Sequence, residues 1–199
     1  MSRESSTHAT LGFRVKSGRA VAVLLGGSAQ SPAVLDGRVI DLCDPGMPES
    51  RQPYHAAMGK LETDEAKIQR RRKVVAQVAE RSVSGLIKEY AGNGISVRGA
   101  GLVVGSQIDP AKIGNPHVRA HALEGQLFRT VLEDALGFSE VVSIVVRERD
   151  LYQRAAQVLG RSEPELKKEV TALGRDRKGP WRADEKTACL AAWVARREG

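Results

Sequence analysis

His121 and Glu124 lie three residues apart, a spacing that places two side chains on the same face of a helix. Phe128 and Leu132 continue that face with apolar side chains, so we expect the pair to point partly inward. An imidazole beside a carboxylate is a reasonable acid/base couple, because both groups can exchange protons near neutral pH when their environments shift them. The alternative is a structural histidine whose hydrogen bonds are satisfied by its helical neighbour.

Polar residues also follow the apolar segments that are typical of buried strands. In open α/β sheets, ligands bind beyond the carboxyl ends of the parallel strands, so this edge is the predicted floor of a pocket. The alternative is that strand ends are polar in every fold. The residues that we assign to binding have charged or hydrogen-bonding side chains or form a turn: Arg14, Lys16, Ser17, Gly18, Arg51, His55, Ser106, Arg147 and Lys186.

Four residues are the candidates for catalysis: His121, Glu124, Glu148 and Asp184. We expect them to converge in one cleft near Ser17 and Ser106, where the strand ends meet the start of the helix that carries His121. Asp184 also opens a helix, and the helix dipole alone would stabilise a carboxylate there.

Residues 47–60 contain several Pro and Gly and show no periodicity, so they are predicted to be an irregular excursion over the surface. Arg51, Tyr54 and His55 in this segment could close over an anion, although a plain surface loop would need no explanation. His8 and His117 are assigned no role.

The elements that must position these residues follow from hydrophobic periodicity and from turn residues. Strands are predicted over residues 10–15, 20–25, 39–42, 95–104 and 141–146. Strand signal extends back from the third of these to residue 33 but is broken at Asp36 and Gly37. Helices are predicted over residues 63–90, 118–136, 151–159, 164–173 and 183–197.

This order predicts an α/β protein with a mixed sheet, in which an antiparallel meander of three strands precedes two parallel strands. The strand over residues 10–15 is expected in the middle of the sheet, between residues 20–25 and 102–104. A flexible lead-in is predicted for residues 1–9, followed by a single domain over residues 10–199.

The charge balance indicates the class of partner. The chain of 199 residues has a formal net charge of +7, which fits nucleic acid or another anionic ligand. The basic run Gln69–Lys73 is either a solvated helix face or a contact to phosphates. No apolar run is long enough to span a bilayer, and the two cysteines lack metal-binding spacing, so a cytoplasmic protein without membrane contact is expected.

The chain resembles the ribonuclease H-like fold, which Holliday-junction resolvases share with integrases and with the actin-like ATPases. Residues 11–24 are similar to the opening hairpin of a resolvase, and residues 184–193 to its final helix, which carries an acid. The chain also resembles a family of uncharacterised bacterial proteins. That resemblance rests on five groups of residues: Gly12–Val15 with Ser17–Gly18, Arg51–Ala56, His121 with Glu124–Gly125, Arg147–Leu151, and Trp181–Arg182 with Asp184–Lys186.

The resemblance implies a hydrolase of the nuclease or phosphoryl-transfer type if the protein is an enzyme, and it implies that Asp184 is a metal ligand, with Mg²⁺ as the candidate ion. Related nucleases hold two Mg²⁺ ions with an acid on the first strand, where this chain has Arg14. Residues 102–104 are followed by Gly105 and Ser106, not by an acid. A two-ion site needs several carboxylate ligands, so a degenerate site is expected.

Three functional hypotheses follow. The first is a resolvase-like protein that acts on or binds nucleic acid with degenerate chemistry. The second is a nucleotide- or phosphate-binding protein, by analogy with the ATPase branch of the fold, in which the turn at Ser17 and Gly18 would hold phosphate. The third is a non-catalytic interaction protein. Fold alone does not choose between them.

Overall fold

Five strands form one mixed sheet in the order β3-β2-β1-β4-β5. The computed structural model describes residues 7–175 and 177–198. The strands are β1 (Thr7–Lys16), β2 (Arg19–Gly27), β3 (Pro32–Asp41), β4 (Ile95–Val104) and β5 (Ser143–Arg147). The first three strands are antiparallel, and β4 and β5 run parallel to β1. The predicted fold class is therefore confirmed.

Strand β1 lies in the middle of the sheet, as the sequence predicted. Phe13 is paired with Ala22 of β2 on one side and with Leu102 of β4 on the other. The strand begins at Thr7, three residues before the predicted start. The rest of the predicted flexible lead-in, residues 1–6, lies outside the described residues.

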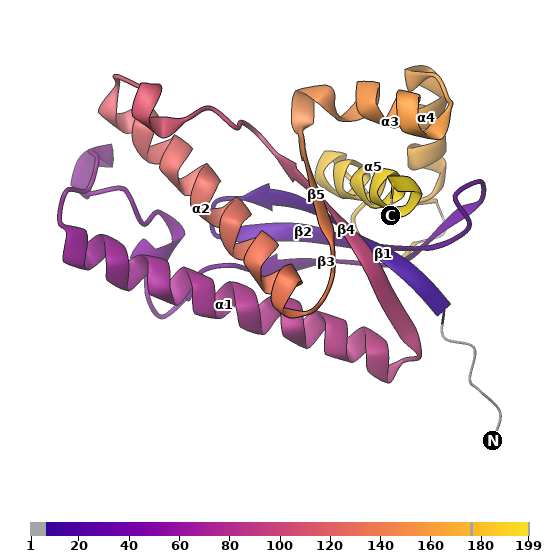
Figure 1. Ribbon diagram of the computed structural model, residues 1–199, viewed down its shortest axis with the longest axis horizontal. Helices are drawn as coiled ribbons and strands as arrows, with labels where there is room; N and C mark the ends of the chain where they lie inside the picture. The colour runs from indigo at the N-terminus through magenta and orange to yellow at the C-terminus, as the bar shows by residue number, and fades with distance from the viewer. Residues whose placement is uncertain (1–6, 176, 199) are drawn as a thin grey trace.

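Helices α1 (Glu65–Gly92) and α2 (Pro116–Phe138) cover one face of the sheet (Figure 1). Alternate residues of β1, among them Leu11 and Phe13, pack against this helical layer because side chains alternate between the two faces of a strand. Asn115 caps α2 by accepting a hydrogen bond from the Val118 amide, and Pro116 occupies the first turn, where an amide would have no helical partner.

Helix α5 (Ala183–Glu198) packs on the opposite face, covered by α3 (Leu151–Leu159) and α4 (Glu163–Ala172) (Figure 1). The backbones approach closely at Gly12 and Gly101. A Cβ atom on Gly12 would overlap the carbonyl oxygen of Ala188, and one on Gly101 would overlap that of Ala191. These glycines therefore set the position of α5, and with it the position of Asp184.

The irregular segment between β3 and α1 contains two short 3-10 helices, Pro48–Arg51 and Ala57–Gly59. Arg71 of α1 holds this segment in place: its Nη1 donates to the carbonyl oxygens of Pro53 at 3.1 Å and His55 at 3.3 Å, and lies 3.3 Å from a carboxylate oxygen of Glu62. The central guanidinium of the basic run is therefore turned inward, whereas Gln69, Arg70, Arg72 and Lys73 are exposed. The remaining 3-10 helices are Pro110–Lys112 and Glu148–Asp150.

In the described part of the chain, no helix is both long and apolar enough to cross a membrane.

Candidate functional site

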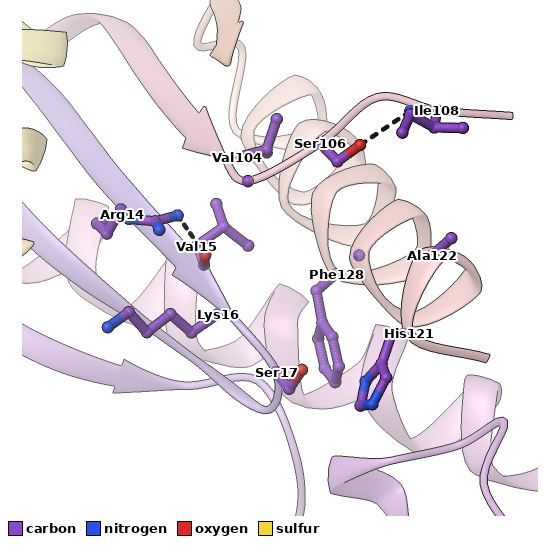
Figure 2. Close-up of a pocket in the computed structure, with 12 residues that line it drawn as sticks. Arg14, Val15, Lys16, Ser17, Val104, Ser106, Ile108, His121, Ala122 and Phe128 are labelled. Atoms are coloured by element: carbon purple, nitrogen blue, oxygen red, sulfur yellow. Dashed lines mark hydrogen bonds between the residues drawn. The ribbon is translucent and has the colours of Figure 1, made fainter. Parts of the chain in front are cut away.

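A cavity of about 410 Å³ opens where the carboxyl ends of β1 and β4 meet α2 (Figure 2). Its polar and charged lining side chains are those of Arg14, Lys16, Ser17, Ser106 and His121. Figure 2 shows His121 and Phe128 reaching from α2 toward Ser17. The cavity is thus at the sheet edge that the sequence predicted for a pocket, and no carboxylate of the described residues lines it.

Arg14, on the first strand, forms an ion pair with Glu148, which directly follows β5. Its Nη2 lies 2.6 Å from a carboxylate oxygen of Glu148, and Nη1 donates to the carbonyl of Val15 at 3.1 Å. The Arg14 side chain is 11% exposed and that of Glu148 is 49% exposed. Arg14 therefore neutralises Glu148 at the end of β5. Arg14 also lies on the first strand, where the resemblance to nucleases of this fold predicts an acid.

Lys16 forms a second ion pair, with Asp184 in the first turn of α5. Its Nζ lies 2.6 Å from a carboxylate oxygen of Asp184, and both side chains are partly exposed. In Figure 2 the Lys16 amino group points away from His121 and Phe128. We call the pairs Arg14–Glu148 and Lys16–Asp184 the ion-paired edge. A cation this close to each acid opposes the binding of a metal ion there.

His121 and Glu124 lie close together, as their spacing predicted, but the stronger partner of Glu124 is His55. Nδ1 of His55 lies 2.6 Å from one carboxylate oxygen of Glu124, whereas Nδ1 of His121 lies 3.7 Å from the other. Glu124 is completely buried, and the His55 side chain is 7% exposed. A residue from the irregular segment therefore completes the couple that the helix spacing suggested.

His117, to which the sequence analysis gave no role, completes a group of three histidines. Its Nε2 lies 3.2 Å from Nε2 of His121, and its Nδ1 lies 2.8 Å from the carbonyl oxygen of Gly59. We call His55, His117 and His121 the histidine cluster; one ring nitrogen from each lies within 4.8 Å of the others. The overlooked signal is the four-residue spacing of His117 and His121, which places them on one helix face.

Burial shifts the pKa values of Glu124 and His121 in opposite directions. It raises the pKa of the Glu124 carboxyl above its usual value, against the opposing effect of the hydrogen bond with His55. Burial also lowers the pKa of His121, and the neighbouring His55 and His117 lower it further. The neutral form of His121 is therefore favoured.

Arg14, Lys16, Ser17 and Ser106 are the predicted binding residues that line the cavity, and the others are not part of its lining. Gly18, with φ of +77°, forms the tight turn after Ser17, and a Cβ atom there would lie 2.8 Å from Cγ of Arg51. Arg147 forms an ion pair with Asp150. Lys186 is half-buried on α5, and Ser106 accepts a hydrogen bond from the Ile108 amide at 3.2 Å, which shapes its own loop.

The four candidate catalytic residues thus fall into two groups. His121 and Glu124 belong to α2, on the α1/α2 face, whereas Glu148 and Asp184 pair with cations of β1. Within residues 7–175 and 177–198, no hydrogen bond or ion pair joins the two groups. Each group therefore has its own partners, and the four residues do not form one hydrogen-bonded site in the described part of the chain.

Comparison with solved structures agrees with the topology. RuvC of Thermus thermophilus superposes with a TM-score of 0.56 at 11% identity, covering 94% of this chain and 92% of that one. The same protein in complex with a Holliday junction substrate gives 0.56 at 10% identity, over 94% and 91% of the two chains. The chain has a ribonuclease H-like, resolvase-like fold.

A third similar structure is Ydc2, the yeast mitochondrial Holliday junction resolvase, with a TM-score of 0.53 at 11% identity over 98% of this chain and 80% of that one. No protein-family model and no curated protein sequence matches the chain. These comparisons therefore establish the resolvase-like fold and do not assign the chain to a family.

Proposed function

We propose that this protein binds nucleic acid through a resolvase-like domain that lacks two-ion nuclease chemistry. The observation that carries the proposal is the lining of the cavity at the sheet edge, where Arg14 and Lys16 stand and the described residues contribute no carboxylate. A cavity without carboxylates offers no ligands for a pair of metal ions, and a phosphate that entered it would compete with Glu148 and Asp184 for Arg14 and Lys16.

The chemistry of the neighbouring acids supports the same proposal. Glu148 directly follows β5 and Asp184 lies in the first turn of α5, and each is 2.6 Å from a basic side chain of β1. Two-ion phosphoryl transfer needs carboxylates that are free to hold cations about 3.5–4 Å apart. An acid already neutralised by Arg or Lys would have to give up that ion pair first.

Net charge and fold both support a polyanionic ligand. The formal net charge of +7 attracts polyanions, and one of the similar resolvase structures is a complex with a Holliday junction. Arg51 beside the Gly18 turn and Lys186 on α5 extend the basic character beyond the cavity. We therefore infer that the phosphate backbone, not base identity, is the main recognition element.

The binding test uses fluorescently labelled single-stranded, duplex and four-way-junction DNA across a salt series. We expect binding that weakens by more than about tenfold between 50 and 200 mM salt, because phosphate contacts release counterions. An Arg51→Ala/Lys186→Ala variant should bind more weakly, whereas Lys88→Ala, an exposed lysine on the last turns of α1, should match wild type. An absence of binding at low salt would contradict the proposal.

The cleavage test incubates the same DNA substrates with Mg²⁺ or Mn²⁺. We expect no cleavage above the background of a matched buffer control. Metal-dependent cleavage that is lost in an Asp184→Asn variant would overturn the inference that the ion-paired edge has no nuclease function.

A second candidate function is binding of a free nucleotide or another phosphorylated metabolite. The cavity volume of about 410 Å³ falls within the range of small-molecule sites, roughly 300–1,000 Å³. Calorimetry with nucleoside mono- and triphosphates distinguishes the candidates. Tight nucleotide binding without DNA binding would favour the second, whereas affinity that rises with oligonucleotide length would favour the first.

A further inference from the structure

The histidine cluster brings together three imidazoles from two distant parts of the chain. His55 comes from the irregular segment between β3 and α1, and His117 and His121 come from the first two turns of α2. Their ring centroids lie 4.5–5.3 Å apart, and the ring planes are inclined at 55–82° to one another. The rings are therefore not stacked, and their edges can face a common point.

Hydrogen bonds to two of the histidines determine which nitrogen is free. The Gly59 carbonyl can only accept, so Nδ1 of His117 carries the hydrogen, and Nε2 of the neutral ring has a lone pair. With Glu124 ionised, the same reasoning places the hydrogen of His55 on Nδ1. Its Nε2 is buried and has no hydrogen-bond partner among the described residues. Nε2 of His117 and Nε2 of His55 therefore each carry a lone pair and no hydrogen.

An unpartnered buried nitrogen is costly unless something binds it. The His55 side chain is more than nine-tenths buried, so bulk water does not solvate its Nε2. A bound cation would satisfy this atom and would replace the hydrogen bond between Nε2 of His117 and Nε2 of His121. The cluster thus has an unmet requirement for a ligand that accepts lone pairs.

The separation of the nitrogens matches that requirement. Nε2 of His117 and Nε2 of His121 lie 3.2 Å apart. Two nitrogens that each lie about 2.0–2.1 Å from a tetrahedral Zn²⁺ ion are about 3.3 Å from one another. One ring nitrogen of each histidine lies within 4.8 Å of the others, so the rings must move closer together for all three to reach one ion.

The outer hydrogen bonds are also those of a metal site. Histidines that bind metals usually donate their other ring hydrogen to a carboxylate or a backbone carbonyl, which fixes the tautomer and orients the ring. Glu124 does this for His55, and the Gly59 carbonyl does it for His117. Arg71 further fixes His55 by donating to its backbone carbonyl. Each of these contacts is in place without an ion.

We propose that His55, His117 and His121 bind one divalent transition-metal ion such as Zn²⁺. Three neutral imidazoles suit Zn²⁺, Co²⁺ or Ni²⁺ and do not suit Mg²⁺, which prefers oxygen ligands. Glu124 supplies a nearby negative charge. Three protein ligands leave a fourth position for water or a phosphate oxygen, and His121 also lines the cavity, so the ion borders the proposed anion-binding site. This proposal stands independently of nucleic-acid binding.

The test is a titration of the full chain, purified without a polyhistidine tag, with Co²⁺ followed by competition with Zn²⁺. We expect one Co²⁺ per chain, visible absorption typical of tetrahedral coordination, displacement by Zn²⁺ and no displacement by excess Mg²⁺. His117→Ala and His121→Ala should each weaken Co²⁺ affinity by more than about 100-fold. Both side chains are exposed, so the far-UV spectrum and melting temperature without metal should stay close to wild type.

The chain supplies a matched control, because its only other histidine is His8. His8→Ala should bind Co²⁺ as wild type does. Glu124→Gln keeps all three ligands but alters the hydrogen bond to His55, so it should lower affinity by about 10- to 100-fold. The proposal is overturned if wild type binds no Co²⁺, or if the His117→Ala/His121→Ala double variant binds it with unchanged affinity.

Discussion

The ion-paired edge and the histidine cluster are both next to the same cavity, yet they differ in whether their polar side chains all have a partner. At the edge, Arg14 and Lys16 each meet a carboxylate at 2.6 Å. In the cluster, two of the three imidazoles, those of His55 and His121, approach one buried carboxylate, that of Glu124, and a ring nitrogen of His55 is left without a partner.

This difference indicates where a cation can bind. Acids that are paired with basic side chains have little remaining attraction for a metal ion, although acids are the residue type that usually attracts one. Imidazoles with free lone pairs keep that attraction. The acids of the ion-paired edge are thus neutralised, and the unfilled donor atom belongs to the histidine cluster on the α1/α2 face of the sheet.

The largest effect on the ion-paired edge is expected from Gly12→Ala. The new Cβ atom would overlap the backbone of α5, so the helix that carries Asp184 must move away from the sheet. We expect a loss of about 3 kcal/mol in the free energy of unfolding, measured by urea denaturation. Hydrogen exchange should increase in α5 more than in α1 and α2.

Gly85→Ala is the control for that substitution. Gly85 is an exposed residue within α1 and has no atoms near its would-be Cβ position, so alanine should stabilise the helix by about 0.5–1 kcal/mol. Equal stability of Gly12→Ala and wild type would contradict the close approach of α5.

A smaller effect is expected when the histidine cluster loses its carboxylate. Glu124→Ala leaves Nδ1 of the buried His55 without an acceptor and should cost about 2 kcal/mol in thermal or urea unfolding. Glu124→Gln retains an acceptor oxygen and should recover most of that loss. If both variants are equally destabilised, the charge of Glu124 matters and the hydrogen bond does not.

Breaking the Arg14–Glu148 pair should have a moderate effect. Glu148→Ala leaves the mostly buried guanidinium of Arg14 without its carboxylate, and we expect a loss of about 1 kcal/mol because Glu148 itself is half exposed. Glu133→Ala removes the partner of Arg129 in a pair within α2 and should cost about 0.3–0.5 kcal/mol. A smaller loss for Glu148→Ala than for Glu133→Ala would show that the edge pair is not special.

The smallest effect is expected from Lys16→Ala. Both Lys16 and Asp184 are about one-third exposed, and Asp184 keeps the favourable interaction with the amino end of α5. We expect a loss of about 0.5 kcal/mol at low salt that shrinks at 1 M salt. The prediction is wrong if Lys16→Ala lowers the free energy of unfolding as much as Glu148→Ala does and if salt does not change that loss. The two ion pairs would then contribute equally despite their different exposure.

Much of the fold was predictable because its signals are local. The predicted bounds of β4 and of α3 coincide with the observed ones, since turn residues and a change of periodicity mark both ends. The order of elements also placed β1 between β2 and β4, because parallel pairing needs a helical crossover and antiparallel pairing does not. The site was only partly predictable: Ser17, Ser106 and His121 do meet at one cavity.

The sequence by itself thus determined the elements, their order and the basic character of the sheet edge, all of which depend on neighbouring residues or on composition. Only the tertiary structure decided the partners of the charged and titratable groups. Glu124 meets His55 from 69 positions away, and Arg14 meets Glu148 from 134 positions away. Such pairs depend on how the irregular segment and the strand ends pack in space. No local periodicity encodes that packing, because it results from contacts made across the whole chain.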